Sequence, residues 1–149
     1  MTRDTAREIA VQIVFGASHS ACEPSEFLEH FLSEEYFSTL ADENDLYAER
    51  PEGDFAEYIR AVVESVFSNQ AEIDAGIAKY SRSWSVKRIS GTALAVLRVA
   101  VAEILYRHDV SVATAINSAV EIDKKYDDTD TVSFVNGVLG GFVRGENLA

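Results

Sequence analysis

Apolar residues recur at intervals of three and four positions along most of this chain, as they do on one face of an α-helix. No segment shows the sustained alternation of apolar and polar positions that is typical of a strand. The sequence therefore predicts an all-α bundle of six or seven helices. The expected helices span residues 3–18, 24–37, 55–80, 92–108, 111–126 and 130–142, where the third segment is one long helix or two.

The breaks in this pattern agree with the local chemistry. The only two prolines, Pro24 and Pro51, lie where the helical pattern is interrupted. Side chains that can cap a helix N-terminus are expected at Asp54, at Ser111, and at Asp130 or Thr131. The chain has 149 residues, of which 47% are hydrophobic, and it contains no internal repeat. We therefore expect one helical domain over residues 1–149.

The last expected helix contains an unusual dipeptide. In "SFVNGVLGGF", Phe134, Val138 and Phe142 repeat every four residues and indicate a core-facing stripe. Asn136 and Gly137 lie in its middle, although a glycine in a helix interior costs about 1 kcal/mol relative to alanine. A close approach by a neighbouring helix at Gly137, and a hydrogen bond from Asn136 to a loop or helix end, would explain both residues.

Acidic charge is concentrated in one part of the chain. The formal net charge is −12, and residues 23–74 carry 15 acidic side chains but only two basic ones, Arg50 and Arg60. The segments before and after are close to neutral. An anion-binding surface at the two ends of the chain is therefore compatible with the overall acidity.

Several classes of protein are disfavoured. No run of 18 apolar residues predicts a membrane span, and Asp4 and Glu8 interrupt any signal-peptide pattern, so a cytoplasmic protein is expected. Cys22 is the only cysteine, which excludes a disulfide framework and a cysteine metal cluster. No phosphate-binding loop or nucleophile motif is present. We expect no enzyme activity, no cofactor and no metal.

Residues at the two ends of the chain could contact nucleic acid, although composition and periodicity alone favour their structural alternatives. Arg3, Arg7 and Gln12 can lie along one edge of the first helix, where arginines can bind phosphates, while Gln12 and Phe15 can meet bases. The alternative is a surface turn in which both arginines pair with Asp4 and Glu8. For Phe134, the alternative to a base contact is simple core packing.

These residues resemble the NusB family of bacterial transcription antitermination factors. The similarity is carried by "ARExAVQxxF" near the N-terminus, by "VLRxA" in the fourth expected segment, by "DVxxxxAIN" at the start of the next, and by "FVNGVL" in the last. Three of these motifs occur in the expected order and at the expected separations within the C-terminal half. They include four residues to which we assign structural roles: Arg98, Asn117, Asn136 and Gly137.

The resemblance implies a NusB-like fold of two three-helix subdomains. It also implies an RNA-binding adaptor that pairs with NusE, a small-subunit ribosomal protein, binds boxA-type RNA and supports the RNA polymerase antitermination complex on ribosomal RNA operons. Some family members self-associate, which leaves a homodimer open. By position, the residues that the resemblance assigns to RNA are Arg3, Arg7, Gln12, Phe15, Asp130 and Phe134.

Departures from the family pattern leave alternatives. Asp4 and Thr5 stand where the family usually has arginines, and each lost phosphate contact weakens RNA binding. We therefore expect RNA binding to depend on a basic partner. One alternative is a helical protein-interaction module with little RNA affinity. Another is the NusB-like domain of an RNA methyltransferase, which would require a further catalytic domain.

Overall fold

The computed structural model describes residues 1–81 and 88–148. Within these residues the chain forms eight α-helices and one 3-10 turn. The helices are α1 (Arg3–Ser18), α2 (Pro24–Leu32), α3 (Glu34–Leu40), α4 (Gly53–Ser68), α5 (Gln70–Tyr80), α6 (Gly91–Tyr106), α7 (Val112–Asp123) and α8 (Thr129–Gly145), and the turn η1 (Asp45–Tyr47) lies between α3 and α4.

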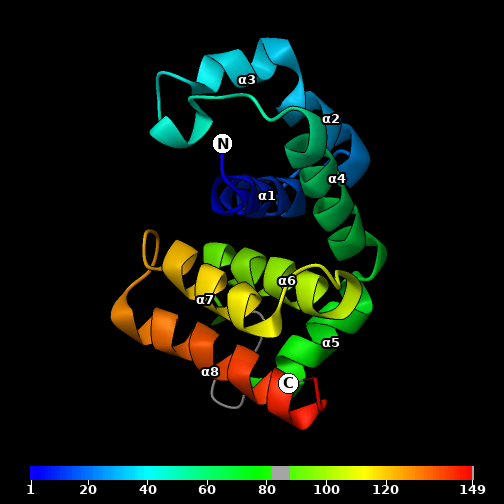
Figure 1. Ribbon diagram of the computed structural model, residues 1–149, viewed down its shortest axis with the longest axis vertical. Coiled ribbons are helices and arrows are strands. Elements are labelled where there is room, and N and C mark those ends of the chain that lie inside the picture. The colour runs from blue at the N-terminus through cyan, green and yellow to red at the C-terminus, as the bar shows by residue number, and fades with distance from the viewer. Residues whose placement is uncertain (82–87, 149) are drawn as a thin grey trace.

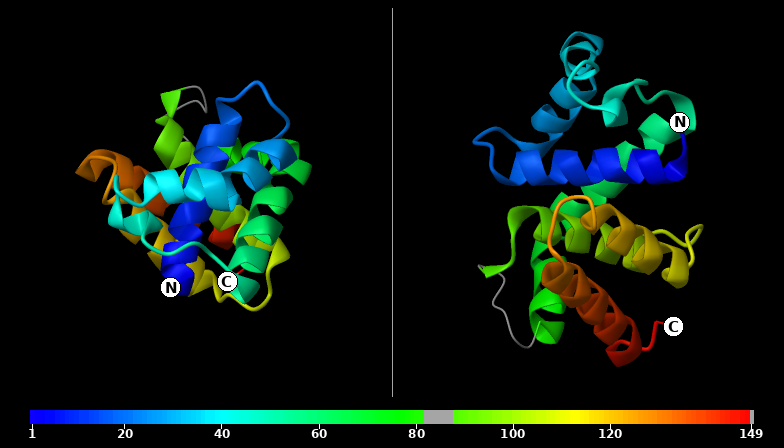
Figure 2. Two further views of the ribbon diagram at one scale, coloured as in Figure 1. Left: turned by 90° about the horizontal axis from the view of Figure 1, so that it is seen from above. Right: turned by 90° about the vertical axis from the view of Figure 1, so that its left-hand side faces the viewer.

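The helices are arranged in two halves. Helices α1 to α4 form the upper half in Figure 1, and α5 to α8 form the lower half. Figure 2 shows α1 lying across α6 and α7, and α1 packs against both α4 and α6. Helix α8 covers the far side of the lower half, where it packs against α5, α6 and α7. Helices α1 and α6 therefore form the contact between the halves.

The all-α prediction is confirmed, but the structure contains more helices than expected. The segment 24–37 is divided at Ser33, which ends α2 and begins α3. The Ser33 hydroxyl donates to the carbonyl of His30 and accepts from the amide of Tyr36, so one side chain satisfies both helix ends. The segment 55–80 is two helices, because the chain turns at Asn69 between α4 and α5.

The helix N-termini confirm one predicted cap and correct two. Ser111 caps α7, where its hydroxyl accepts from the amide of Thr114. The cap of α8 is Asp128, two residues before the nearer of the two predicted caps, and it accepts from the amide of Thr131. Asp54 lies inside the first turn of α4 and does not cap it. An acidic side chain in a first turn still interacts favourably with the helix dipole.

The core lies between α1, α4 and α6. Helix α6 is buried almost all round, which explains its continuously apolar sequence, and Leu97 and Val101 are among its buried residues. Helix α1 contributes Ile9 and Ile13, and α4 contributes Ile59. Arg98 of α6 is also buried and donates to both carboxylate oxygens of Asp74 in α5 at 2.9 Å. This ion pair therefore joins α6 to α5.

Candidate nucleic-acid interface

Arg7 is buried inside the protein. Its side chain is 3% exposed, and its Nε and Nη2 atoms donate to the two carboxylate oxygens of Glu103 at 2.6 and 3.0 Å. Its Nη1 atom donates to Asp4 at 2.6 Å and to Ser118 at 3.1 Å. Burial alone would lower the pKa of Arg7, but the hydrogen bonds and charge of Glu103 raise it above its ordinary value. Arg7 is a structural residue that joins α1 to α6 and α7, and it is not placed to bind a phosphate.

Arg3 lies on the surface one turn before Arg7. Its guanidinium carbon lies 4.3 Å from the ring centre of Tyr58 in α4, and Arg107 lies 5.1 Å from the same ring. Both arginines also contact Asp109, at 3.6 Å from Arg3 and 2.9 Å from Arg107. Burial and the charge of Glu103 raise the pKa of Tyr58, so its ring stays neutral. Arg3 is therefore accessible but partly neutralised.

Gln12 and Phe15 lie toward the other end of α1. Phe15 is half-buried against the core and packs on His19, with ring centres 4.6 Å apart. It also touches the start of α6, because a Cβ atom built on Gly91 would lie 2.7 Å from the Phe15 ring. Gln12 is half-buried and lies beside Tyr126. Tyr126 belongs to the connection between α7 and α8. At 1.5 Å per residue, Phe15 lies about 18 Å along the helix axis from Arg3.

Asp130 and Phe134 lie in the first two turns of α8. Asp130 is exposed, and Phe134 is half-buried with its ring packed against the core. The structure therefore shows core packing for Phe134, while a base contact stays a prediction. The connection that carries Tyr126 joins this end of α8 to Gln12. The position of Tyr126 beside Gln12 thus relates the segment before α8 to α1.

The explanation that the sequence suggested for Asn136 and Gly137 is wrong. A Cβ atom built on Gly137 meets nothing within 4 Å, so no neighbouring helix approaches it. Asn136 is exposed, and no hydrogen bond of its side chain occurs within the part of the chain that the structure describes. The dipeptide lies on the solvent face of α8.

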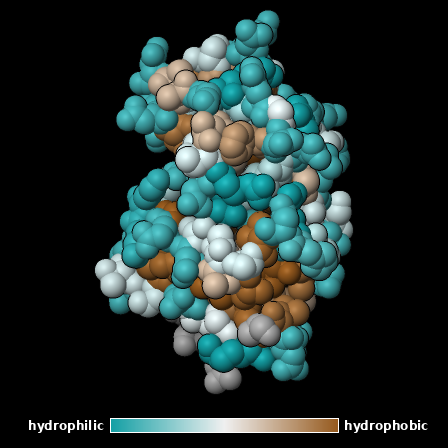
Figure 3. Space-filling model, viewed as in Figure 1, coloured by the Kyte–Doolittle hydropathy of each residue, from teal (hydrophilic) through white to brown (hydrophobic). Residues whose placement is uncertain are grey.

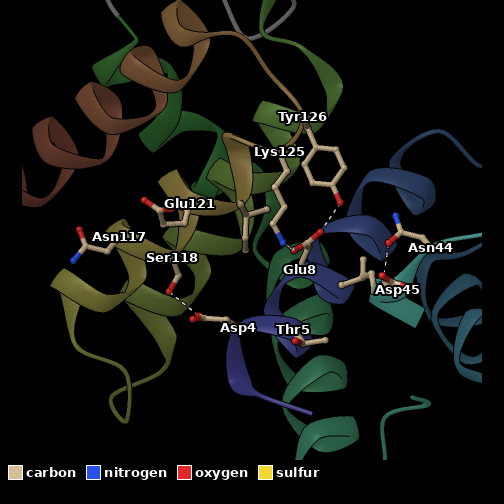
Figure 4. Close-up of a pocket in the computed structure, with 12 residues that line it drawn as sticks. Asp4, Thr5, Glu8, Asn44, Asp45, Asn117, Ser118, Glu121, Lys125 and Tyr126 are labelled. Atoms are coloured by element: carbon tan, nitrogen blue, oxygen red, sulfur yellow. Dashed lines mark hydrogen bonds and ion pairs between the residues drawn. The ribbon is translucent and has the colours of Figure 1, made fainter. Parts of the chain in front are cut away.

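A cleft of about 710 Å³ lies between α1, η1 and α7 (Figure 4). The side chain of Asn117 lines it, and its walls carry Asp4, Glu8, Asp45 and Glu121. Glu8 is largely occupied, because it accepts from Lys125 at 2.7 Å and from the Tyr126 hydroxyl at 2.5 Å. Burial and the Glu8 carboxylate raise the pKa of Tyr126. The cleft separates Arg3 from Gln12 and Phe15 with an acidic wall.

The surface around this cleft is polar. Figure 3 shows hydrophilic side chains across the junction of the two halves, where the outline is also hollowed, and an apolar area over the lower half. Sequence reasoning missed Tyr58, Arg107 and Glu103, which surround the two N-terminal arginines. Glu103 and Arg7 are 96 residues apart, so no spacing along the chain relates them.

The fold and this surface define an all-helical binding protein whose candidate contacts are aromatic, amide and arginine side chains. Among the described helices, none is long and apolar enough to cross a membrane. The profile of the NusB family matches residues 4–144, and the chain belongs to this family.

Similar proteins cover nearly the whole chain. It is 38% identical to the transcription antitermination protein NusB of Acetivibrio thermocellus, over 97% of this chain and 90% of that protein. It is 35% identical to NusB of Symbiobacterium thermophilum, over 97% and 91%.

Solved structures of the same family share the fold. A crystal form of T. maritima NusB has a TM-score of 0.79 at 26% identity, and covers 97% of this chain and 92% of its own. A complex of the antitermination factors NusB and NusE with double-stranded RNA contains a chain with a TM-score of 0.75 at 24% identity, with 96% of both chains covered.

Proposed function

We propose that this chain is an RNA-binding adaptor of transcription antitermination. It acts without catalysis, in the cytoplasm, as a single domain over residues 1–149 whose two halves correspond to the two subdomains of the family. It pairs with NusE, binds boxA-type RNA and joins the RNA polymerase antitermination complex. The match of residues 4–144 to the NusB family carries this proposal, in which Gln12, Phe15, Asp130 and Phe134 together form the RNA end of the molecule.

RNA binds at this end, where α1 meets the connection from α7 to α8. Phe15 and Phe134 are both half-buried, and each ring packs against the core. Stacking of a base on an aromatic ring contributes about 1–3 kcal/mol. Gln12 offers an amide to a base edge, and the exposed carboxylate of Asp130 can accept from a base amino group.

Arg3 contributes from a distance, as a phosphate contact near the opposite end of α1. Because Arg7 is held by Glu103, only one of the two N-terminal arginines can serve RNA. A protein with few phosphate contacts binds RNA weakly and with a shallow salt dependence. Tight binding therefore requires further cations, which a basic partner supplies.

A basic partner fits the acidic surface. Residues 23–74 carry most of the acidic side chains, and the cleft between α1, η1 and α7 presents acidic walls beside the RNA end. Electrostatic attraction of this kind speeds the association of oppositely charged proteins, and it favours a cationic partner over a partner that is neutral or acidic. NusE in this position would cover acidic groups that otherwise repel RNA.

Two features of the structure favour a second function. The burial of Arg7 and the acidic walls of the cleft fit a protein-interaction module with little RNA affinity of its own. The two proposals differ in whether the aromatic end contributes to RNA binding once NusE is present.

The test is an RNA-binding titration of side-chain variants in the presence of equimolar NusE. Phe134→Leu keeps an apolar side chain on the core but removes the ring face, and we expect it to weaken boxA binding about 5- to 100-fold, as loss of one stacked base does. Arg60→Gln is the control, because Arg60 pairs with Glu29 on the outer surface of α4. Equal RNA affinity of Phe134→Leu and the parent chain would favour the protein-interaction module.

A further inference from the structure

Two carboxyl groups meet where α7 ends, one of them completely buried and the other half-buried. Asp123 is completely buried, and no donor within the described residues reaches either of its carboxylate oxygens. Asp127 lies one turn further, and its Oδ2 atom is likewise buried without a donor. The two carboxyl groups lie within hydrogen-bonding reach of each other. Burial of an ionised carboxylate without a donor is strongly unfavourable, so two charged groups cannot persist there.

Among the residues that the structure describes, no cation pairs with either carboxyl group. The charged groups that act on Asp123 are Asp127 and Asp128, and both are acidic. The neighbouring lysines are used elsewhere, since Lys124 donates to Glu121 and Lys125 donates to Glu8 of α1. Helix α8 begins with further acidic side chains, and the C-terminal end of α7 carries the negative end of the helix dipole.

A hydrogen-bonded chain connects the pair to α6. The Ser90 hydroxyl donates to Oδ1 of Asp127 at 3.1 Å, and the same hydroxyl caps α6 by accepting from the amide of Ala93 at 3.1 Å. A proton on Asp123 would complete this chain by donating to Asp127. The connection between α7 and α8 would then be fixed to the N-terminus of α6.

We propose that Asp123 keeps its proton at neutral pH, donates it to Asp127 and acts as a pH-sensitive latch that holds the α7–α8 connection against α6. Burial, the hydrogen bond with Asp127 and the charges of Asp127 and Asp128 raise the pKa of Asp123 to about 8. The latch is closed at neutral pH. It opens when the proton is lost, because two adjacent negative charges then face each other in a buried site.

A proton fits this site better than a metal ion does. Ca²⁺ takes six to eight oxygen ligands and Mg²⁺ requires octahedral coordination, whereas the pair offers two carboxyl groups with almost no access to water. In the described ranges, no group of three or more His, Cys, Asp or Glu side chains is arranged to hold a metal.

The latch should also affect RNA binding at the RNA end of the molecule, and this inference rests on the proposed function. The connection that it fixes contains Tyr126, which binds Glu8, and leads directly to Asp130 and Phe134. Opening the latch would release the start of α8 from α6. RNA affinity in the presence of NusE should then fall as the pH rises past 8.

The first test compares unfolding of the parent chain and of Asp123→Asn over pH 5–9. Asn keeps the donor and cannot ionise. Since the pKa of Asp123 is about 8 in the folded chain and about 3.9 in an unfolded one, its stabilisation is complete below pH 4 and is lost progressively up to pH 8. We expect the folding constant of the parent to fall about tenfold per pH unit between pH 5 and 7.5 relative to the variant.

The control for this comparison is Asp42→Asn, an exposed acidic residue in the loop after α3. Its pH profile should parallel that of the parent. If the profile of Asp123→Asn is also parallel, the latch does not exist. Stabilisation of the parent but not of Asp123→Asn by Mg²⁺ or Ca²⁺ would overturn the proposal in favour of a metal site.

A second measurement needs no variant. The carboxyl carbon of Asp123 in the isotope-labelled parent chain, followed by NMR, should titrate with a midpoint near pH 8. A midpoint below pH 5 would overturn the proposal even if Asp123→Asn failed to fold. Neither measurement involves RNA, so the latch can be demonstrated even if the proposed RNA function fails.

Discussion

Replacement of Gly137 with alanine should stabilise this protein. Gly137 lies in the interior of α8, and a Cβ atom at this position meets nothing within 4 Å. Alanine therefore adds no clash and removes the entropic penalty of a helical glycine, which is about 0.8–1.0 kcal/mol. For a domain of this length, that gain corresponds to a rise in the melting temperature of about 2–4 °C.

The assay is thermal unfolding followed by circular dichroism, with Gly16→Ala as the comparison. Gly16 also lies within a helix, but its Cβ atom would lie 2.5 Å from the Phe27 ring. Gly16→Ala should therefore be less stable than the parent, by about 1–3 kcal/mol, because the half-buried ring must shift. If Gly137→Ala melted at or below the temperature of the parent, the open surface assigned to this part of α8 would be refuted.

Other variants test the roles assigned to the N-terminal half of the surface and to a helix cap. Arg7→Ala leaves Glu103 buried without its cation and should lower the free energy of unfolding in urea by about 3–5 kcal/mol. Arg3→Ala removes only an exposed pair with Asp109 and should lower this free energy by less than about 1 kcal/mol. Comparable losses for both would contradict the structural assignment of Arg7. Ser111→Ala removes the cap of α7 and should cost about 1 kcal/mol by the same assay, while no loss would show that the cap is dispensable.

The sequence predicted the helices well because their apolar spacing is regular. The division at Ser33 was missed because Leu32 and Tyr36 keep the four-residue spacing that a continuous helix would also show. What ends α2 is the hydroxyl of Ser33 itself, which serves both helix ends. Serine is common inside surface helices as well as at caps, so its presence alone does not predict a break.

The candidate site was only partly predictable. The spacing of Arg3 and Arg7 places them on one edge of α1 but does not distinguish the exposed residue from the buried one. That difference arises from Glu103, which only the folded chain brings to Arg7. Asp123 raised the same difficulty, because a polar residue near a helix end is ordinarily on the surface, and only packing shows it to be buried.

The central claim is that this chain binds RNA as an adaptor with NusE. The most direct test is fluorescence anisotropy of a labelled boxA-type RNA, titrated with the chain alone and with equimolar NusE, at two salt concentrations and against a scrambled RNA. We predict weak binding by the chain alone, and tight, sequence-selective and more salt-dependent binding with NusE, because the partner adds phosphate contacts. Formation of the complex with NusE without any gain in affinity for boxA RNA would contradict the claim.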